Sequence, residues 1–250
     1  MKRNDKMIDI IAHRGYSGKY PENTMTAFKA AERSLADGIE MDVRFTKDKQ
    51  LVVIHDETVN RTTDGKGLVS EFNLKDLKKL DAGANHSNSF KKEEILTLKE
   101  FLDWASETNL ILNIEIKYSK NTYFEYESDI LNILANYNLN ERLIISSFNP
   151  EGLAKIAQLA PEIKLGLLYT KKISQPDEYI KKYQIDALHP SKKITGRDAI
   201  ALAEKNQIPI RIFTINTSKE IKKYLKMNCT AIITDYPEQA IEIRNKLSNY

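Results

Sequence analysis

Short runs of aliphatic and β-branched residues recur along the chain, and segments with the 3.6-residue spacing of an amphipathic helix follow most of them. The runs that predict strands lie at 8–12, 38–45, 51–56, 110–117, 142–148, 164–169, 186–190, 208–216 and 230–235. Helical spacing covers most of the intervals, at 22–36, 97–108, 124–137, 150–160, 176–183, 195–206, 217–227 and 237–247. This strand–helix alternation predicts a parallel sheet with its helices outside.

A closed (β/α)8 barrel uses eight strands, so one of the nine runs must have another role. Only TKDKQ separates the run at 38–45 from the run at 51–56, which is too short for a parallel crossover. We predict that these two runs form an antiparallel hairpin, with its turn between Asp48 and Lys49 and with His55 opposite Asp42. The fold prediction is therefore an α/β (β/α)8 TIM barrel with a small rim hairpin. A doubly wound open sheet is the alternative.

Residues 57–96 lack periodicity apart from a short helical stretch at 74–80. They lie between the predicted hairpin and the next barrel strand. Long irregular segments in compact domains are usually functional, so we expect this insertion to cap the barrel mouth. No linker rich in Pro, Gly or Ser interrupts the chain, and we predict a single domain over 1–250.

Acidic and basic side chains concentrate at the predicted ends of the first three barrel strands, where catalytic groups of such barrels lie. Glu40 and Asp42 are two residues apart and share one face of a strand, as do Glu115 and Lys117. Three carboxylates converging inside a barrel would repel one another and lose their hydration. A bound cation resolves this conflict, and ligation by oxygen alone is typical of Mg²⁺ or Ca²⁺. Local salt bridges with Lys or Arg are the alternative.

The basic residues and histidines near these carboxylates suit work on a phosphate ester. Arg14 and Lys117, added to three carboxylates and a divalent cation, leave about one net positive charge, which favours an anionic phosphodiester. Cleavage of a phosphodiester needs a base and an acid, and His13 and His55 can serve as both near neutral pH. A purely structural role is the alternative for each histidine. The other two of the chain's four histidines are weaker candidates.

The composition excludes some classes of function. The chain has 250 residues, 41% hydrophobic and 29% charged, which is ordinary for a globular protein with a sizeable core. A net charge of +3 is not the dense basic balance of a nucleic-acid binder, so we expect no nucleic-acid partner. Cys229 is the single cysteine, so no internal disulfide can form. No apolar run approaches the roughly 18–20 residues of a membrane span, and we expect a cytoplasmic protein without stable membrane insertion.

Ten short motifs occur in a fixed order between residue 11 and about residue 237: HRG, PENT, DGIEMDV, VVIHD, RTT, LDAG, NIEIK, SSFNP, FTIN and TDYP. In these motifs the chain resembles the glycerophosphodiester phosphodiesterase family. The resemblance implies a (β/α)8 barrel, one divalent cation (Mg²⁺ or Ca²⁺) as cofactor, and a small-molecule glycerophosphodiester as substrate. It implies hydrolysis to glycerol 3-phosphate and an alcohol.

The resemblance also assigns roles to residues. The family's catalytic histidines fall on His13 and His55. Its metal carboxylates fall on Glu40, Asp42 and Glu115. Its phosphate-contacting basic residues fall on Arg14 and Lys117. Three further residues match family positions near the site, the first two as substrate-binding groups: Asn23, Asn216 and Asp56.

Two rival functions and one mechanistic question accompany this interpretation. A lysophospholipase D or a phosphatidylinositol-type phospholipase C of similar fold would need an apolar ramp at the barrel mouth, where the loop SNSFKKEE offers Phe90. A barrel that binds phosphate esters without turnover would lack a histidine or carboxylate, but all are present. Ser146 and Ser147 have no histidine predicted beside them. We therefore expect water or the glycerol 2-hydroxyl to attack, the latter through a cyclic phosphate.

Overall fold

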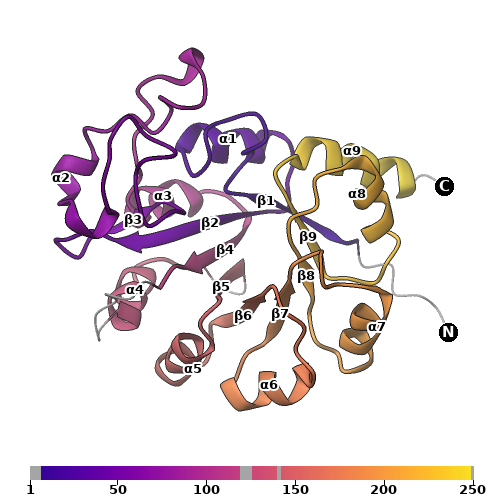
Figure 1. Ribbon diagram of the computed structural model, residues 1–250. Coiled ribbons are helices and arrows are strands. Elements are labelled where there is room, and N and C mark those ends of the chain that lie inside the picture. Colours follow the sequence, from indigo (N-terminus) through magenta and orange to yellow (C-terminus); the bar gives the residue numbers. More distant parts are fainter. Residues whose placement is uncertain (1–6, 119–125, 140–141, 249–250) are drawn as a thin grey trace.

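The computed structural model describes residues 7–118, 126–139 and 142–248, in which eight parallel strands surround a central axis and the helices lie outside them (Figure 1). The strands are β1 (Asp9–His13), β2 (Gly38–Phe45), β4 (Ile111–Ile116), β5 (Leu143–Ser147), β6 (Lys164–Tyr169), β7 (Ala187–Pro190), β8 (Arg211–Ile212) and β9 (Ala231–Thr234). Their order is β7-β6-β5-β4-β2-β1-β9-β8. Single bridges from Leu188 to Ile210 and from Ser191 to Phe213 join the two ends of this order. The barrel is thus nearly closed, which confirms the fold prediction and excludes the open sheet.

The helices follow the strands as the spacing predicted. They are α1 (Met25–Arg33), α3 (Leu98–Ala105), α4 (Tyr126–Leu134), α5 (Pro150–Leu159), α6 (Pro176–Tyr183), α7 (Arg197–Lys205), α8 (Ser218–Tyr224) and α9 (Pro237–Ser248). Thr97 and Thr217 begin α3 and α8 with capping boxes, in which each threonine hydroxyl accepts from a backbone N–H of the first turn. The predicted boundaries differ from these by a few residues. The first two residues of the prediction at 124–137 lie outside the described residues.

The strand predicted at 208–216 is mostly irregular, and only the two residues of β8 pair as a strand. The reason is that this segment changes its hydrogen-bonding partner. Pro209 has no N–H to donate. The backbone N–H of Phe213 then donates to a carbonyl of β7, and that of Ile215 donates to a carbonyl of β9. No single ladder continues along the segment, although it still closes the barrel.

The predicted hairpin is present, but its predicted register is wrong by one residue. β3 (Leu51–Val53) runs antiparallel to β2 and pairs Val53 with Val43. Residues 46–50 connect the two strands. Thr46 N–H donates to the carbonyl of Gln50, so residues 47–49 form the turn, and Lys49 adopts a left-handed φ of 58°. The strand ends at Val53, so His55 lies beyond the ladder and is not paired with Asp42.

The segment between β3 and α3 includes the predicted insertion. It contains the 3-10 turns η1 (Val69–Glu71) and η2 (Asn88–Phe90) and the helix α2 (Leu74–Leu77), which is shorter than the predicted 74–80. Together with Val52 of β3, its apolar side chains form a separate buried cluster: Ile54, Val59, Val69, Leu77 and Ile95. The Thr26 hydroxyl of α1 donates to Glu93, which ties the insertion to the first helix of the barrel.

The alternation of side chains along β2 explains how a barrel strand carries acidic groups. Ile39, Met41 and Val43 belong to the main apolar cluster, which also includes buried residues of α1 and α3. Glu40 and Asp42 alternate with them and so point to the other face of the strand, toward the barrel axis. The eight residues of β2 therefore contribute apolar side chains to the packing outside the barrel and carboxylates to the polar site inside it.

Candidate active site

Three carboxylates converge where β2 and β4 run side by side. Asp42 is in register with Glu115, and Glu40 lies two residues before Asp42 on the same face. One oxygen from each of the three side chains lies within 4.8 Å of the others. All three residues are buried, with exposed fractions of 4% for Glu40, 0% for Asp42 and 6% for Glu115. The structure therefore brings together the acidic set that the sequence singled out.

The electrostatics of this cluster fit a bound cation. Burial raises the pKa of Glu40 well above its usual value, and the charges of Asp42 and Glu115 raise it further. Burial and the Asp42 charge also raise the pKa of Glu115, to about 7. For Asp42 burial acts in the same direction, but the nearby cations Lys117 and Arg14 outweigh it and hold its pKa below the usual range. A hard divalent ion would relieve the repulsion that opposes ionisation of the other two carboxyls.

Two basic side chains border the carboxylates. Arg14 follows β1 in a left-handed conformation with φ 55°, and its backbone N–H donates to Glu40 Oε2 at 3.0 Å. Its Nε lies 3.3 Å from Asp42 Oδ2. Lys117 Nζ lies 3.0 Å from Asp42 Oδ1 and also pairs with Glu115. The salt bridges considered as an alternative are thus present, but two cations cannot balance three carboxylates when all three are ionised.

Asn23 belongs to this cluster through Asp42. It is buried, with φ 59°, and its Nδ2 donates to Asp42 Oδ2 at 2.8 Å. Its backbone N–H donates to the carbonyl of Arg14 at 3.0 Å. Asn23 therefore fixes the Asp42 carboxylate and the Arg14 backbone relative to each other.

His13 lies at the end of β1 and contacts a carboxylate from the far end of the chain. Its Nδ1 is 2.6 Å from Asp235 Oδ1, 222 residues away in sequence, and its Nε2 is 3.9 Å from Glu40 Oε2. The contact exists because β9, which precedes Asp235, is the sheet neighbour of β1. Asn216 Nδ2 donates to the other oxygen of Asp235, and Ser17 Oγ donates to Oδ1 at 3.2 Å. Asp235 thus connects the side chains of Asn216 and His13, because each of them contacts one of its two carboxylate oxygens.

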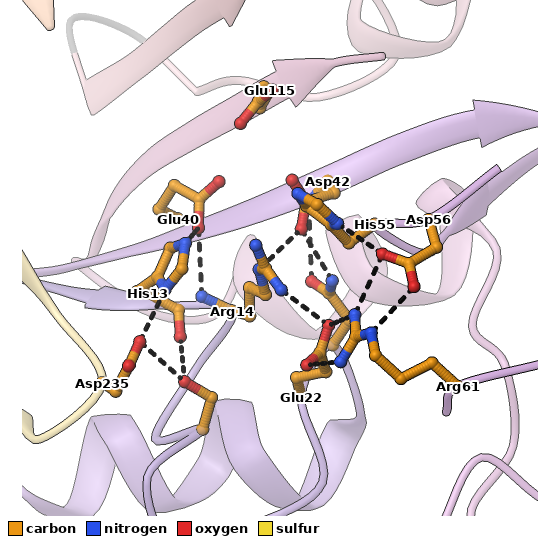
Figure 2. A network of polar contacts seen from close by, with 12 residues as sticks. His13, Arg14, Glu22, Glu40, Asp42, His55, Asp56, Arg61, Glu115 and Asp235 are labelled. Carbon is orange, nitrogen blue, oxygen red and sulfur yellow. Dashed lines mark hydrogen bonds and ion pairs between the residues drawn. The ribbon is translucent and has the colours of Figure 1, made fainter. Parts of the chain in front are cut away.

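His55 lies on the opposite side of the carboxylates and next to Asp42 (Figure 2). Its Nδ1 is 2.7 Å from Oδ1 of the adjacent Asp56. Burial lowers the pKa of His55, and the Asp42 carboxylate opposes that shift. The Arg44 side chain donates to the His55 carbonyl at 2.8 Å, which fixes the backbone beyond β3.

The two histidines therefore share one arrangement. In each ring Nδ1 faces a carboxylate, so the proton resides there and Nε2 is the nitrogen available for proton transfer. Sequence reasoning placed Asp56 near the site through the family resemblance, but it did not pair Asp235 with His13. The available signal was the position of Asp235 directly after the strand that closes the barrel beside β1.

Two further charged residues join the network. Glu22 accepts from Arg14 Nη1 at 2.9 Å, and Arg61 of the insertion donates to both Glu22 and Asp56 (Figure 2). The remaining histidines lie elsewhere. His189 is fully buried beside Arg211, and His86 packs its ring edge-to-face on Phe90.

Comparison with known proteins agrees with this geometry. The model of the glycerophosphoryl diester phosphodiesterase family matches residues 13–239. A glycerophosphodiester phosphodiesterase of Caldanaerobacter subterraneus subsp. tengcongensis is 40% identical over 237 residues, covering 95% of this chain and 98% of the relative. One of Bacillus altitudinis is 40% identical over 248 residues, covering 96% and 100%. A solved Oleispira antarctica phosphodiesterase, in complex with the product sn-glycerol-3-phosphate, is 29% identical with a TM-score of 0.91, covering 96% of this chain and 97% of that one.

The family match includes both ends of the site, from His13 at the end of β1 to Asp235 after β9. Because the family model and the relatives cover nearly the full chain, the likeness is not limited to one motif or half-barrel. The predicted enzyme class is confirmed, and the chain belongs to the glycerophosphoryl diester phosphodiesterase family.

Proposed function

We propose that this protein hydrolyses glycerophosphodiesters to glycerol 3-phosphate and an alcohol, using one divalent cation and two histidines. The observation that carries the proposal is a buried triad of carboxylates with a histidine–carboxylate pair on either side of it (Figure 2). The product bound to the Oleispira relative, sn-glycerol-3-phosphate, is the product expected of this reaction.

Glu40, Asp42 and Glu115 would hold the cation, for which we propose Mg²⁺ or Ca²⁺, because the three donors are hard oxygens within 4.8 Å of one another. When bound, the ion supplies positive charge at the phosphate and lowers the pKa of a hydroxyl beside it. With the ion, Arg14 and Lys117 give the site about one net positive charge, which attracts a phosphodiester anion.

Arg14 and Lys117 are proposed to bind the phosphate oxygens, Arg14 through its planar guanidinium and Lys117 as a point charge. Both side chains are mostly buried, with exposed fractions of 16% and 11%, so water screens their charges only weakly. Asn23 and Asn216 contact Asp42 and Asp235 in this structure, and contact of either amide with substrate stays a prediction.

The histidines are proposed to transfer the protons. Asp235 and Asp56 hold Nδ1 of His13 and His55, so each ring presents Nε2 to the reacting groups. One histidine takes the proton of the glycerol 2-hydroxyl as its oxygen forms a bond to phosphorus. The other protonates the alcohol oxygen as its bond to phosphorus breaks, leaving a cyclic phosphate, in which water then breaks the bond between phosphorus and the 2-oxygen. The 2-hydroxyl is already next to the phosphate, so no second reactant has to be recruited.

A serine nucleophile is disfavoured by the geometry of β5. Ser147 Oγ donates to the carbonyl of Ile116 at 2.9 Å and is 1% exposed, and Ser146 is 0% exposed. Neither has a histidine partner among the hydrogen bonds of the described residues.

Phe90, which an apolar ramp for lipids would need, packs edge-to-face on Tyr20 with 5.5 Å between ring centroids. This contact of Phe90 does not favour the lipid-cleaving alternatives.

The deciding experiment is turnover of glycerophosphocholine by purified protein with Mg²⁺ or Ca²⁺, with release of glycerol 3-phosphate as the readout. No product with either ion would overturn the proposal. A substrate analogue that lacks the 2-hydroxyl should bind but react very slowly. Cleavage of that analogue at a rate close to that of glycerophosphocholine would instead indicate direct attack by water.

Several finer expectations stay predictions. We propose a single domain over 1–250 in which residues 57–96 cap the barrel mouth. Cytoplasmic location, the absence of a nucleic-acid partner and the lack of stable membrane insertion also stay predictions. Among the described residues, no helix is long and apolar enough to cross a membrane.

A further inference from the structure

The insertion sends one side chain into the polar network of the site. Arg61 Nη1 and Nη2 donate to the two carboxylate oxygens of Glu22, at 2.6 and 2.8 Å. Its Nε and Nη2 donate to the two oxygens of Asp56, at 2.8 and 3.1 Å. A single guanidinium therefore holds two carboxylates, each in the bidentate geometry that arginine favours.

Each of these carboxylates also holds a residue of the proposed catalytic machinery. Glu22 Oε1 accepts from Arg14 Nη1 at 2.9 Å, and Asp56 Oδ1 lies 2.7 Å from His55 Nδ1. Arg14 in turn reaches the carboxylate cluster, with its Nε 3.3 Å from Asp42 Oδ2. Arg61 thus contacts Arg14 indirectly, through Glu22, and contacts His55 indirectly, through Asp56 (Figure 2).

We propose that Arg61 is a positioning residue that sets Arg14 and His55 in their working orientations at once, through Glu22 and Asp56. The inference deepens the proposed function and rests on it. Without Arg61, Glu22 and Asp56 would each lose two donors and could turn to other partners. Arg14 and His55 would then lose the fixed groups that orient them.

The backbone that carries Arg61 is itself held in place, as this role requires. Asn85 Nδ2 donates to three carbonyls of this turn, at 3.3 Å to Asn60, 3.2 Å to Arg61 and 2.6 Å to Thr63. The Thr63 hydroxyl donates to the carbonyl of Val59 at 2.8 Å, and Thr63 is 2% exposed. The guanidinium is therefore presented from a fixed turn.

The geometry of the guanidinium matters more than its charge. The Arg61 side chain is 48% exposed, so solvent screens its simple attraction to the two carboxylates. Four directed N–H bonds in a planar fork are something that a lysine cannot reproduce. The role therefore predicts that a lysine at this position restores activity only in part.

The first test measures steady-state kinetics with glycerophosphocholine and Mg²⁺ for Arg61→Met and Arg61→Lys. Loss of a residue that orients catalytic groups typically costs about 10- to 100-fold in activity. We expect Arg61→Met to lower kcat by that factor with a smaller change in KM, and Arg61→Lys to recover part of the loss. Wild-type kcat in either variant would overturn the proposal, and the lysine variant keeps the test valid if Arg61→Met fails to fold.

Lys78 provides a matched control within the same insertion. Like Arg61 it bridges two carboxylates, Glu94 at 3.2 Å and Glu100 at 2.6 Å, but neither of these touches the site. We expect Lys78→Met to keep wild-type kcat and KM. An equal loss in Lys78→Met and Arg61→Met would assign the effect to general stability of the insertion and overturn the proposal.

The second test asks whether Arg61 acts through its two partners. In a Glu22→Gln, Asp56→Asn background, adding Arg61→Met should cause little further loss of kcat, because the groups through which it acts are already changed. A full additional loss there would overturn the inference. An inactive wild-type enzyme would instead overturn the proposed function, so the two failures are distinguishable.

Discussion

Replacement of Asp235 by asparagine tests the proposed chemistry with almost no change of shape. Burial opposes ionisation of Asp235, but its hydrogen bonds with His13, Asn216 and Ser17 hold its pKa below the usual range. The group is therefore a carboxylate at neutral pH, 2.6 Å from His13 Nδ1. An amide at that position can donate to Nδ1, which would place the ring proton on Nε2 and leave His13 without a free nitrogen at Nε2 to accept a proton.

The expected size of this effect follows from the contact that is lost. A hydrogen bond to a charged group contributes about 1.5–3 kcal/mol, and each 1.36 kcal/mol is about tenfold in rate. If that energy is expressed in the transition state, Asp235→Asn lowers kcat roughly 10- to 150-fold, and the circular-dichroism melting curve stays close to wild type. The assay is release of glycerol 3-phosphate from glycerophosphocholine.

Glu238 offers the matched control for Asp235. It lies on α9, accepts from the Tyr16 hydroxyl at 2.8 Å and from Lys19 Nζ at 2.6 Å, and contacts neither histidine of the site. Glu238→Gln should therefore keep wild-type kcat. If Asp235→Asn keeps kcat within twofold of wild type, the orientation of His13 by this carboxylate is not part of catalysis and the reasoning fails.

Four further outcomes are expected. Excess chelator should abolish activity and Mg²⁺ or Ca²⁺ should restore it, whereas full activity after chelation and dialysis would contradict a metal site. The same severe loss is expected, by the glycerol 3-phosphate assay, for the variants Glu40→Gln, Asp42→Asn and Glu115→Gln. His13→Ala and His55→Ala should each lose roughly 10²–10⁴ in kcat while substrate binding weakens less, and a variant with near-normal kcat would remove that histidine from the mechanism. Cys229 is 5% exposed, and burial raises its pKa to about 12. Alkylation of this thiol at pH 8 should therefore be slow in the native protein and fast in denaturant. Fast labelling of the native protein would show that the thiol is accessible.

Hydrophobic periodicity predicted the barrel because the pattern that indicates each strand or helix lies within a short stretch of sequence. The strand predicted at 8–12 is β1, shifted by one residue to 9–13, and the eight residues GIEMDVRF become β2 with the predicted bounds. The hairpin register and the strand at 208–216 depend instead on how backbone groups meet across space. The left-handed residue Lys49 makes the loop odd in length, and Pro209 with its neighbours changes partners along one segment. Neither feature follows from hydrophobic spacing.

The functional site likewise has parts that local sequence patterns predicted and parts that they did not. Glu40, Asp42 and Glu115 could be placed together because neighbouring parallel strands bring their carboxyl ends to one rim. The contacts of Asp235 with His13 and of Arg61 with Glu22 join residues 222 and 39 positions apart, between strand ends and loops. Such contacts depend on barrel closure and on the path of the insertion, and a single sequence encodes these only through the complete fold.

The arrangement of the strands explains why the chemistry lies on one side of the barrel. β4, β2, β1 and β9 are consecutive neighbours, and they carry Glu115, Asp42, His13 and the segment that ends in Asp235. The other arc uses its inward polar groups differently: Ser146, which is in register with Glu115, and His189 are both fully buried. One arc therefore holds the reactive groups, while the other contains the bridges between β7 and β8 that join the two ends of the sheet. Because β1 and β9 are the first and last strands of the chain and pair directly, the His13–Asp235 contact forms only when both ends of the chain have folded, and the proposed acid–base chemistry depends on that pairing.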